Sequence, residues 1–307
     1  MKFNYLKLKT SFITLGAFML LTLSCGNDKN NPPESTDETA GDTEKVTNNG
    51  VLNVGGELFS IPSPVQTAML IQKSGAAYDK SILNLPANNS LYKTDFSKAL
   101  NLGIYGADLG YVTMYNKTQD ALSFLASVKR LADDLGVSGA FDQATMERIN
   151  KNITVKDSML VLVGIAYRAS DAYLKNNQRN DVSGLILTGG WIESLNFAIM
   201  VNKDKSNEEI KIRIAEQKQA LASIIKLLGQ YSSQPEYTTL IDGLKDLNKV
   251  YETIEFKYVY EAPVIDVANK TTSINSRTEV NVSKEQIDQI TAKVQAIRDK
   301  IVNPVKS

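Results

Sequence analysis

The feature that most constrains the fold is a helix-start pattern that occurs four times along the chain. In each case a serine is followed three residues later by Glu or Gln: "SPVQ", "SNEE", "SQPE" and "SKEQ", at Ser63, Ser206, Ser233 and Ser283. In such a capping box the serine hydroxyl accepts a hydrogen bond from the third backbone N–H, and the Glu or Gln side chain bonds back to the serine N–H. Because an apolar run at helical spacing follows each box, the pattern predicts helices that begin at these serines.

The segments that follow such signals are amphipathic. Their apolar residues recur every three or four positions, which is typical of a helix with one buried face. Gly75, Gly136 and Gly229 each follow such a run, and glycine ends a helix in the left-handed conformation at the lowest cost. The pattern predicts an all-α bundle or array of about eight helices, most clearly over residues 120–136, 208–229, 237–254 and 287–301.

One stretch departs from the helical pattern. Residues 256–282, "FKYVYEAPVIDVANKTTSINSRTEVNV", are rich in β-branched and aromatic residues and contain Pro263. Such residues favour strands, and "NKTTS" contains residue types that are common in turns. We expect a short irregular or β-hairpin excursion near 256–282.

The amino terminus has the pattern of a secretory signal. Lys2, Lys7 and Lys9 precede the apolar run "SFITLGAFMLLTLS", which is shorter than the roughly 20 residues that span a bilayer. The junction "LTLSCG" resembles a bacterial lipobox, with Ser24 before Cys25. The resemblance implies that residues 1–24 are removed and that Cys25 carries lipid such as palmitate; the alternative is a signal peptide that happens to contain a cysteine.

Composition then divides the mature chain into two parts. Residues 26–50 contain a single branched aliphatic residue, Val46, among many Asn, Asp, Glu, Thr and Pro residues. Such a segment buries too little apolar surface to offset the entropy of ordering, so we expect residues 25–50 to be a lipidated, disordered tether. The remaining residues, 51–307, are expected to form a single helical domain.

Missing residue types exclude several kinds of chemistry. The chain has no histidine, and Cys25 is its only cysteine. Triads that need histidine, thiol catalysis, disulfides and ferritin-like di-iron sites are therefore excluded, and we expect no metal site and no cofactor. The formal net charge is zero, and loss of three lysines with the signal leaves it near −3, which gives no electrostatic footprint for nucleic acid.

The segment "NLGIYGADLGYVTMY", residues 101–115, contains three glycines inside a helical pattern. Gly103, Gly106 and Gly110 lie three and four residues apart, and each costs a helix interior about 1 kcal/mol relative to alanine. Glycines on nearly one face indicate that a second backbone approaches closely there.

The same segment carries a polar stripe. Tyr105, Asp108, Val112 and Tyr115 recur at helical spacing. One interpretation makes the tyrosines core residues with their hydroxyls at the rim, since aromatic stripes usually serve packing. The other makes Asp108 and the tyrosine hydroxyls part of a ligand pocket.

A second glycine-containing segment, "LILTGGWIESLNFAIM", holds the only tryptophan, Trp191, and an isolated acid, Glu193. A buried carboxylate is costly unless it is paired, and we expect Arg168 to be the partner of Glu193. Either this is a structural ion pair, or Asp108, Arg168, Trp191 and Glu193 line one cavity. Convergence on a cavity of a few hundred Å3 would favour a site, and mutual pairing would favour packing.

Four segments carry a family resemblance: "IPSP", "LNLGIYGADLGY", "YLKNNQRND" and "GGWIESL". Together they resemble uncharacterised all-helical envelope lipoproteins of Bacteroidota-type bacteria, over much of residues 58–255. The resemblance implies a helical fold and an envelope location, and it assigns no activity or substrate. Gly26 stands where enteric inner-membrane lipoproteins have a retaining aspartate, so the analogy favours the outer membrane, on either its periplasmic or its exposed face.

Three functional hypotheses follow. The first is a non-enzymatic, lipid-anchored binding module for an envelope protein or a small ligand, held to the membrane through Cys25. The second is a hydrolase or lyase that uses Asp108 and Glu193 as an acid and base pair. The third is a purely structural lipoprotein. The candidate ligand-binding residues are Tyr105, Asp108, Tyr115, Arg168, Trp191 and Glu193.

Overall fold

The fold was analysed in a computed structural model of the chain. It describes residues 51–54, 57–60, 64–140, 143–204, 206–266 and 270–304. The expected signal peptide, the lipidated Cys25, the tether up to residue 50 and the helix start at Ser63 lie outside these residues. All of these residues fall within one compact unit.

The described residues form ten α-helices, which confirms the all-α class and exceeds the expected eight. They are α1 (Pro64–Lys73), α2 (Asp95–Met114), α3 (Thr118–Asp134), α4 (Gln143–Asn152), α5 (Lys156–Asn176), α6 (Asn180–Asp204), α7 (Glu208–Ala215), α8 (Lys218–Gly229), α9 (Pro235–Glu252) and α10 (Lys284–Val302). Three short 3-10 helices accompany them: η1 (Lys80–Ile82), η2 (Pro86–Leu91) and η3 (Ser138–Ala140).

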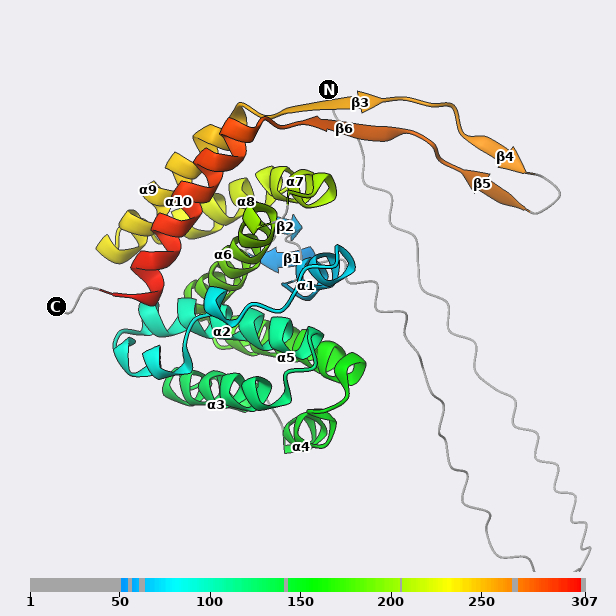
Figure 1. The fold of residues 1–307 in the computed structure, drawn as a ribbon. Coiled ribbons are helices and arrows are strands. Elements are labelled where there is room, and N and C mark those ends of the chain that lie inside the picture. Colours follow the sequence, from blue (N-terminus) through cyan, green and yellow to red (C-terminus); the bar gives the residue numbers. More distant parts are fainter. Residues whose placement is uncertain are drawn as a thin grey trace, which may run out of the picture. The chain divides into compact units, whose positions relative to one another are not determined.

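Helices α2 and α6 form the centre of the unit, with more contact between them than between any other two elements (Figure 1). Two glycines allow this close approach. A Cβ atom added at Gly103 would lie 1.9 Å from the carbonyl oxygen of Ile186, and one added at Gly189 would lie 1.9 Å from that of Leu100. The expected close backbone approach is therefore confirmed at Gly103.

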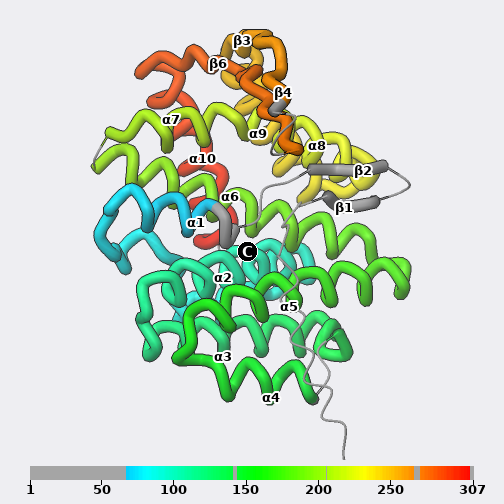
Figure 2. The backbone as a smooth tube through the Cα atoms, turned by 90° about the vertical axis from the view of Figure 1, so that its right-hand side faces the viewer, coloured from blue at the N-terminus to red at the C-terminus, as the bar shows by residue number. Residues whose placement is uncertain are grey.

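The other helices form two groups around this pair. Helices α3, α4 and α5 lie on one side of it, and α8, α9 and α10 lie on the other (Figures 1 and 2). α3 packs on α2, α5 contacts both α2 and α6, and α4 packs on α5. On the opposite side α9 packs between α8 and α10, and α10 also reaches α6 and α2.

The predicted helix starts are only partly correct. Ser283 caps α10 as expected, since its hydroxyl accepts from the Gln286 N–H and Gln286 bonds back to the Ser283 N–H. At the second box, however, the capping side chain is that of Asn207, one residue after Ser206. Helix α9 begins at Pro235 without a side-chain cap, so the prediction at Ser233 is wrong. Proline needs no N–H partner at a first helical position, which replaces the serine cap there.

The predicted helix ends show the same mixture. Gly75 and Gly136 have φ values of +76° and +68°, so both end their helices in the left-handed conformation as expected. Gly229 is instead the last residue of α8. The single helix expected over 208–229 is two helices, which are separated at Glu216 and Gln217.

The excursion after α9 is a two-part β-hairpin. Strand β3 (Glu255–Val259) pairs with β6 (Arg277–Asn281), and beyond them β4 (Val264–Asp266) pairs with β5 (Thr271–Ser273), all antiparallel. The expected hairpin is confirmed, with four short strands (Figure 1). A further hairpin, β1 (Val51–Val54) with β2 (Glu57–Ser60), was not expected from the sequence.

Helix α6 is the one helix among the described residues that is long and apolar enough to cross a membrane. Its most apolar 18-residue window has a mean hydropathy of 1.4, and 89% of that window is buried by the surrounding helices. This burial is what a core helix of a globular unit requires, and it explains why α6 is apolar all round.

Candidate functional site

Asp108 on α2 and Glu193 on α6 meet in the core, and both have no exposed surface. The partner of Glu193 is Arg298 on α10. The Arg298 guanidinium donates from Nε and Nη2 to the two Glu193 oxygens, with an Nη2–Oε1 distance of 2.6 Å. Its Nη2 also donates to the carbonyl oxygen of Ile82 at 3.0 Å. This fork is the bidentate geometry that best compensates a buried carboxylate.

The expected pairing of Glu193 with Arg168 is therefore wrong. Arg168 is exposed on α5, whereas Arg298 lies 105 residues after Glu193 in the sequence. One signal for Arg298 was present in the sequence. It lies four residues after Val294 and three before Ile301, so it flanks the apolar stripe that α10 buries.

Asp108 has fewer hydrogen-bond partners than Glu193 within the described residues. Its Oδ2 accepts from the Asn84 backbone N–H at 3.3 Å, while its Oδ1 has no hydrogen-bond partner as an acceptor. Burial, followed by the negative charge of Glu193, raises the pKa of Asp108 well above its usual value, and Arg298 opposes this only in part. Burial and the nearby Glu193 charge therefore favour the protonated form of Asp108, and in that form the carboxyl is a hydrogen-bond donor toward Glu193.

A buried amide and tyrosine network closes this junction. The Asn84 side chain donates to Tyr92 Oη at 2.8 Å and to Asn101 Oδ1 at 3.1 Å. Tyr92 and Asn101 in turn donate to the carbonyl oxygens of Val302 and Ile301 at the end of α10. The junction thus fastens α10 and the η1 segment to α2 and α6, and the chain itself supplies the partners of its charged groups.

The remaining predicted ligand residues also have internal partners. Tyr105 Oη donates to the Leu85 carbonyl at 2.9 Å, and Tyr115 Oη donates to the Ala76 carbonyl at 2.8 Å. Trp191 Nε1 donates to Gln217 Oε1 at 3.1 Å and lines a hollow of only about 10 Å3. The six predicted residues do not converge on one cavity.

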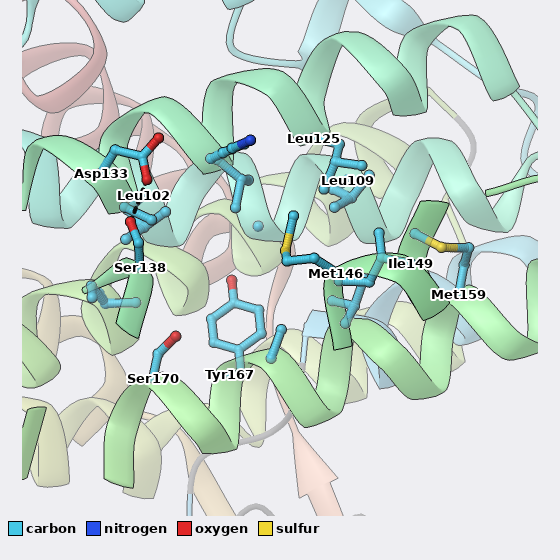
Figure 3. A pocket seen from close by; sticks show the side chains of 17 residues that line it. Leu102, Leu109, Leu125, Asp133, Ser138, Met146, Ile149, Met159, Tyr167 and Ser170 are labelled. Atoms are coloured by element: carbon cyan, nitrogen blue, oxygen red, sulfur yellow. Dashed lines mark hydrogen bonds between the residues drawn. The ribbon is translucent and has the colours of Figure 1, made fainter. Parts of the chain in front are cut away.

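A pocket of about 250 Å3 lies elsewhere, between α2, α3, α4 and α5 (Figure 3). None of the six predicted residues lines it, and carbon atoms make up most of its wall. Its lining comprises Leu102, Gly106, Leu109, Leu125, Val128, Lys129, Ala132, Asp133, Ser138, Met146, Ile149, Met159, Val163, Ala166, Tyr167, Ser170 and Ile186.

The two ends of this pocket differ in polarity. Figure 3 shows Asp133, Ser138 and Ser170 together at one end, where the Ser138 hydroxyl donates to Asp133. The opposite end is apolar, and Tyr167 stands between the two ends. The labelled side chains at the apolar end are Leu109, Leu125, Met146, Ile149 and Met159.

Gly106 shapes this pocket. A Cβ atom at Gly106 would lie 2.4 Å from the Tyr167 hydroxyl, which donates to the Gly103 carbonyl at 2.8 Å. Gly106 thus makes room for a side chain, whereas the sequence pattern led us to expect a second backbone there. Burial raises the pKa of Tyr167, so its hydroxyl stays protonated as this donor.

Comparison with known proteins adds no relative. No protein-family model, no curated protein and no solved structure matches this chain. The function is therefore argued from the geometry of the two regions described above.

The described residues offer little for metal chemistry. Within them, no group of three or more Asp, Glu, His or Cys side chains comes close enough to hold a metal ion. The Asp108 and Glu193 carboxylates could act as an acid and a base only if a substrate reached them. Both are fully buried, and Arg298 covers both oxygens of Glu193.

Proposed function

We propose that this protein is a lipid-anchored lipoprotein of the outer membrane whose helical unit binds a small apolar ligand without catalysis. The observation that carries the proposal is the pocket between α2, α3, α4 and α5, which is lined mostly by carbon and has a few polar groups at one end. Binding sites for small molecules have this composition.

The size of the pocket supports a ligand larger than a single ring. An apolar cavity of about 150 Å3 is large enough to bind benzene, and this pocket measures about 250 Å3. Ligand surface buried against carbon contributes about 25 cal/mol per Å2, so hydrophobic burial would supply most of the affinity.

The lipid anchor is proposed from the "LTLSCG" junction, which resembles a lipobox. Cells that express the full chain and are fed radiolabelled palmitate should incorporate label into the protein, and the Cys25→Ala variant should incorporate none. Labelling that persists in Cys25→Ala would contradict anchoring at this residue.

Binding can be tested without the lipid. The mature chain, residues 25–307 with Cys25→Ser, requires no detergent that would compete for the pocket. We expect the neutral probe N-phenyl-1-naphthylamine to bind it saturably, with a rise in fluorescence as the probe leaves water. Ala166→Trp or Met146→Trp should fill the pocket and abolish this rise.

The matched control is Ala172→Trp, an exposed position on the same helix α5. It should leave probe binding unchanged. Circular dichroism of each variant separates loss of binding from loss of fold. If the probe does not bind, or if folded Ala166→Trp and Met146→Trp still bind it, the pocket is not the site, and the structural-lipoprotein hypothesis gains.

A further inference from the structure

Ser170 is a buried residue whose hydroxyl has no hydrogen-bond partner among the described residues. It is 7% exposed, lies on α5 and makes no hydrogen bond to any part of the chain that the structure describes. Figure 3 shows its oxygen directed into the pocket. Serine in a helix commonly bonds back to the carbonyl four residues earlier, as Ser194 does to Gly190 at 2.6 Å. Because buried polar groups normally have partners, Ser170 is suited to bind a polar atom of a ligand.

The pocket is long in one direction. Met159 and Ser170 both line it from α5, at its opposite ends (Figure 3), and a rise of 1.5 Å per residue separates them by about 16 Å. Leu125 and Asp133 line it from α3 in the same sense, separated by about 12 Å. A linear ligand fits such a space better than a compact ring system does.

The end opposite Ser170 suits a hydrocarbon tail. Met146 and Met159 lie there beside Leu109 and Leu125. Methionine is unbranched and polarizable, so its side chain adjusts to ligands of different lengths. This end has no charged lining residue, which favours a tail without polar groups.

One cation also lines the pocket. Lys129 on α3 is exposed and forms no ion pair with any described residue. Asp133, one helical turn later, already accepts the Ser138 hydroxyl. A head group that accepts hydrogen bonds would therefore be drawn to Ser170 and Lys129, since both are free donors.

From this arrangement we infer that the ligand is a single unbranched acyl chain, with its tail between Met146 and Met159 and its carbonyl-bearing head at Ser170. This inference rests on the proposed function and specifies its ligand class. The head is either the carboxylate of a free fatty acid or the ester of a monoacyl lipid, and both accept a hydrogen bond from the Ser170 hydroxyl.

Displacement of N-phenyl-1-naphthylamine by decanoate and by monodecanoylglycerol tests the inference in the mature chain with Cys25→Ser. We expect at least one of them to displace the probe. Ser170→Ala should weaken that ligand about tenfold relative to the probe, the effect of one hydrogen bond to a ligand oxygen. Ser158→Ala is the matched control, because Ser158 lies on the same helix and outside the pocket lining. It should change neither the affinity for the acyl ligand nor the affinity for the probe.

Lys129→Met distinguishes the two sources. If the head is a carboxylate, the Lys129→Met substitution lowers the affinity for decanoate and leaves the affinity for monodecanoylglycerol unchanged. If the head is an ester, monodecanoylglycerol binds more tightly than decanoate, and the substitution changes neither affinity. The inference is overturned if neither compound displaces a bound probe, or if Ser170→Ala leaves both affinities unchanged. Failure of the probe itself to bind would instead overturn the proposed function.

Discussion

Helix α2 lies between two regions with opposite characters. On one side Asp108 belongs to a closed junction with Glu193 and Arg298, where the chain supplies both the charges and their partners. On another side Gly106 lines a mostly apolar pocket, in which Ser170 makes no hydrogen bond to the described residues. The comparison shows that the more conspicuous polar cluster is internally satisfied, whereas the nearly apolar region keeps an unused hydrogen bond.

The difference has an energetic basis. A buried ion pair gains little over apolar residues of the same shape, because desolvation offsets most of the attraction, but removal of one partner leaves a charge with no compensation. The junction should therefore be sensitive to single substitutions. Substitutions at the pocket should affect ligands more than stability, because its lining already faces open space.

The largest effect is expected from Arg298→Met. Loss of the guanidinium leaves the fully buried Glu193 without its bidentate partner, and breaking a buried pair in this way costs about 3–5 kcal/mol. Urea denaturation of the mature chain should show this decrease in the free energy of unfolding.

Arg168→Met is the matched control for that experiment, since it removes an exposed arginine from α5. Surface substitutions of this kind usually change stability by less than about 0.5 kcal/mol. Equal losses in the two variants would show that Arg298 does not compensate Glu193, and the interpretation of a closed junction would fail.

A second effect is expected where α2 meets α6. In Gly103→Ala the new methyl group would lie 1.9 Å from the Ile186 carbonyl oxygen, so the two backbones must separate. Overpacking of this kind costs about 1–3 kcal/mol. A thermal unfolding curve of the variant should shift to lower temperature.

Gly229→Ala provides the contrast, because a Cβ atom there has nothing within 4 Å. Alanine is favoured over glycine in a helix by up to about 1 kcal/mol, so this variant should match or exceed the stability of the parent. If Gly103→Ala were as stable as Gly229→Ala, the close approach of α2 and α6 would not depend on glycine.

Local patterns predicted the elements better than their pairings. The capping box at Ser283 and the left-handed glycines at Gly75 and Gly136 depend on a few adjacent residues, so the sequence contains the whole signal. The break at Glu216 and Gln217 is different, because the apolar residues keep the helical register from Ile214 to Leu221 and no glycine or proline marks the break.

The site was harder to predict than the fold for a physical reason. A search for reactive residue types finds Asp108 and Glu193. Their partner Arg298, however, comes from a helix that is distant in the sequence, and its pairing with Glu193 leaves these carboxyl groups unavailable to a substrate. The pocket arises from a packing defect among ordinary apolar residues of five α-helices, and no residue type marks it. Ser170 is distinguished by its burial at the pocket without a hydrogen bond to the described residues, which the sequence cannot show.

The smallest effect at pH 5 is expected from Asp108→Asn, and its pH dependence is the sharpest test of the junction. Because the folded pKa of Asp108 lies above its unfolded value of about 3.9, folding takes up a proton between the two values. The free energy of unfolding therefore falls as pH rises through that window, by at most about 1.4 kcal/mol per pH unit, and levels off above the folded pKa.

Asparagine has the shape of the protonated acid and can still donate to Glu193. Asp108→Asn should therefore lower the free energy of unfolding only slightly at pH 5, and its stability relative to the parent should increase as pH rises toward 9. Asp120→Asn is the control, because bonds from Lys80 and Tyr78 lower the pKa of Asp120 and keep it charged throughout that range. The difference in free energy of unfolding between Asp120→Asn and the parent, measured by urea denaturation, should stay constant from pH 5 to pH 9.

If the free energies of unfolding of Asp108→Asn and the parent instead changed in parallel with pH, Asp108 would be ionised in the fold. The junction would then hold two negative charges against Arg298 alone, and it would no longer be the self-satisfied region that sets it apart from the pocket.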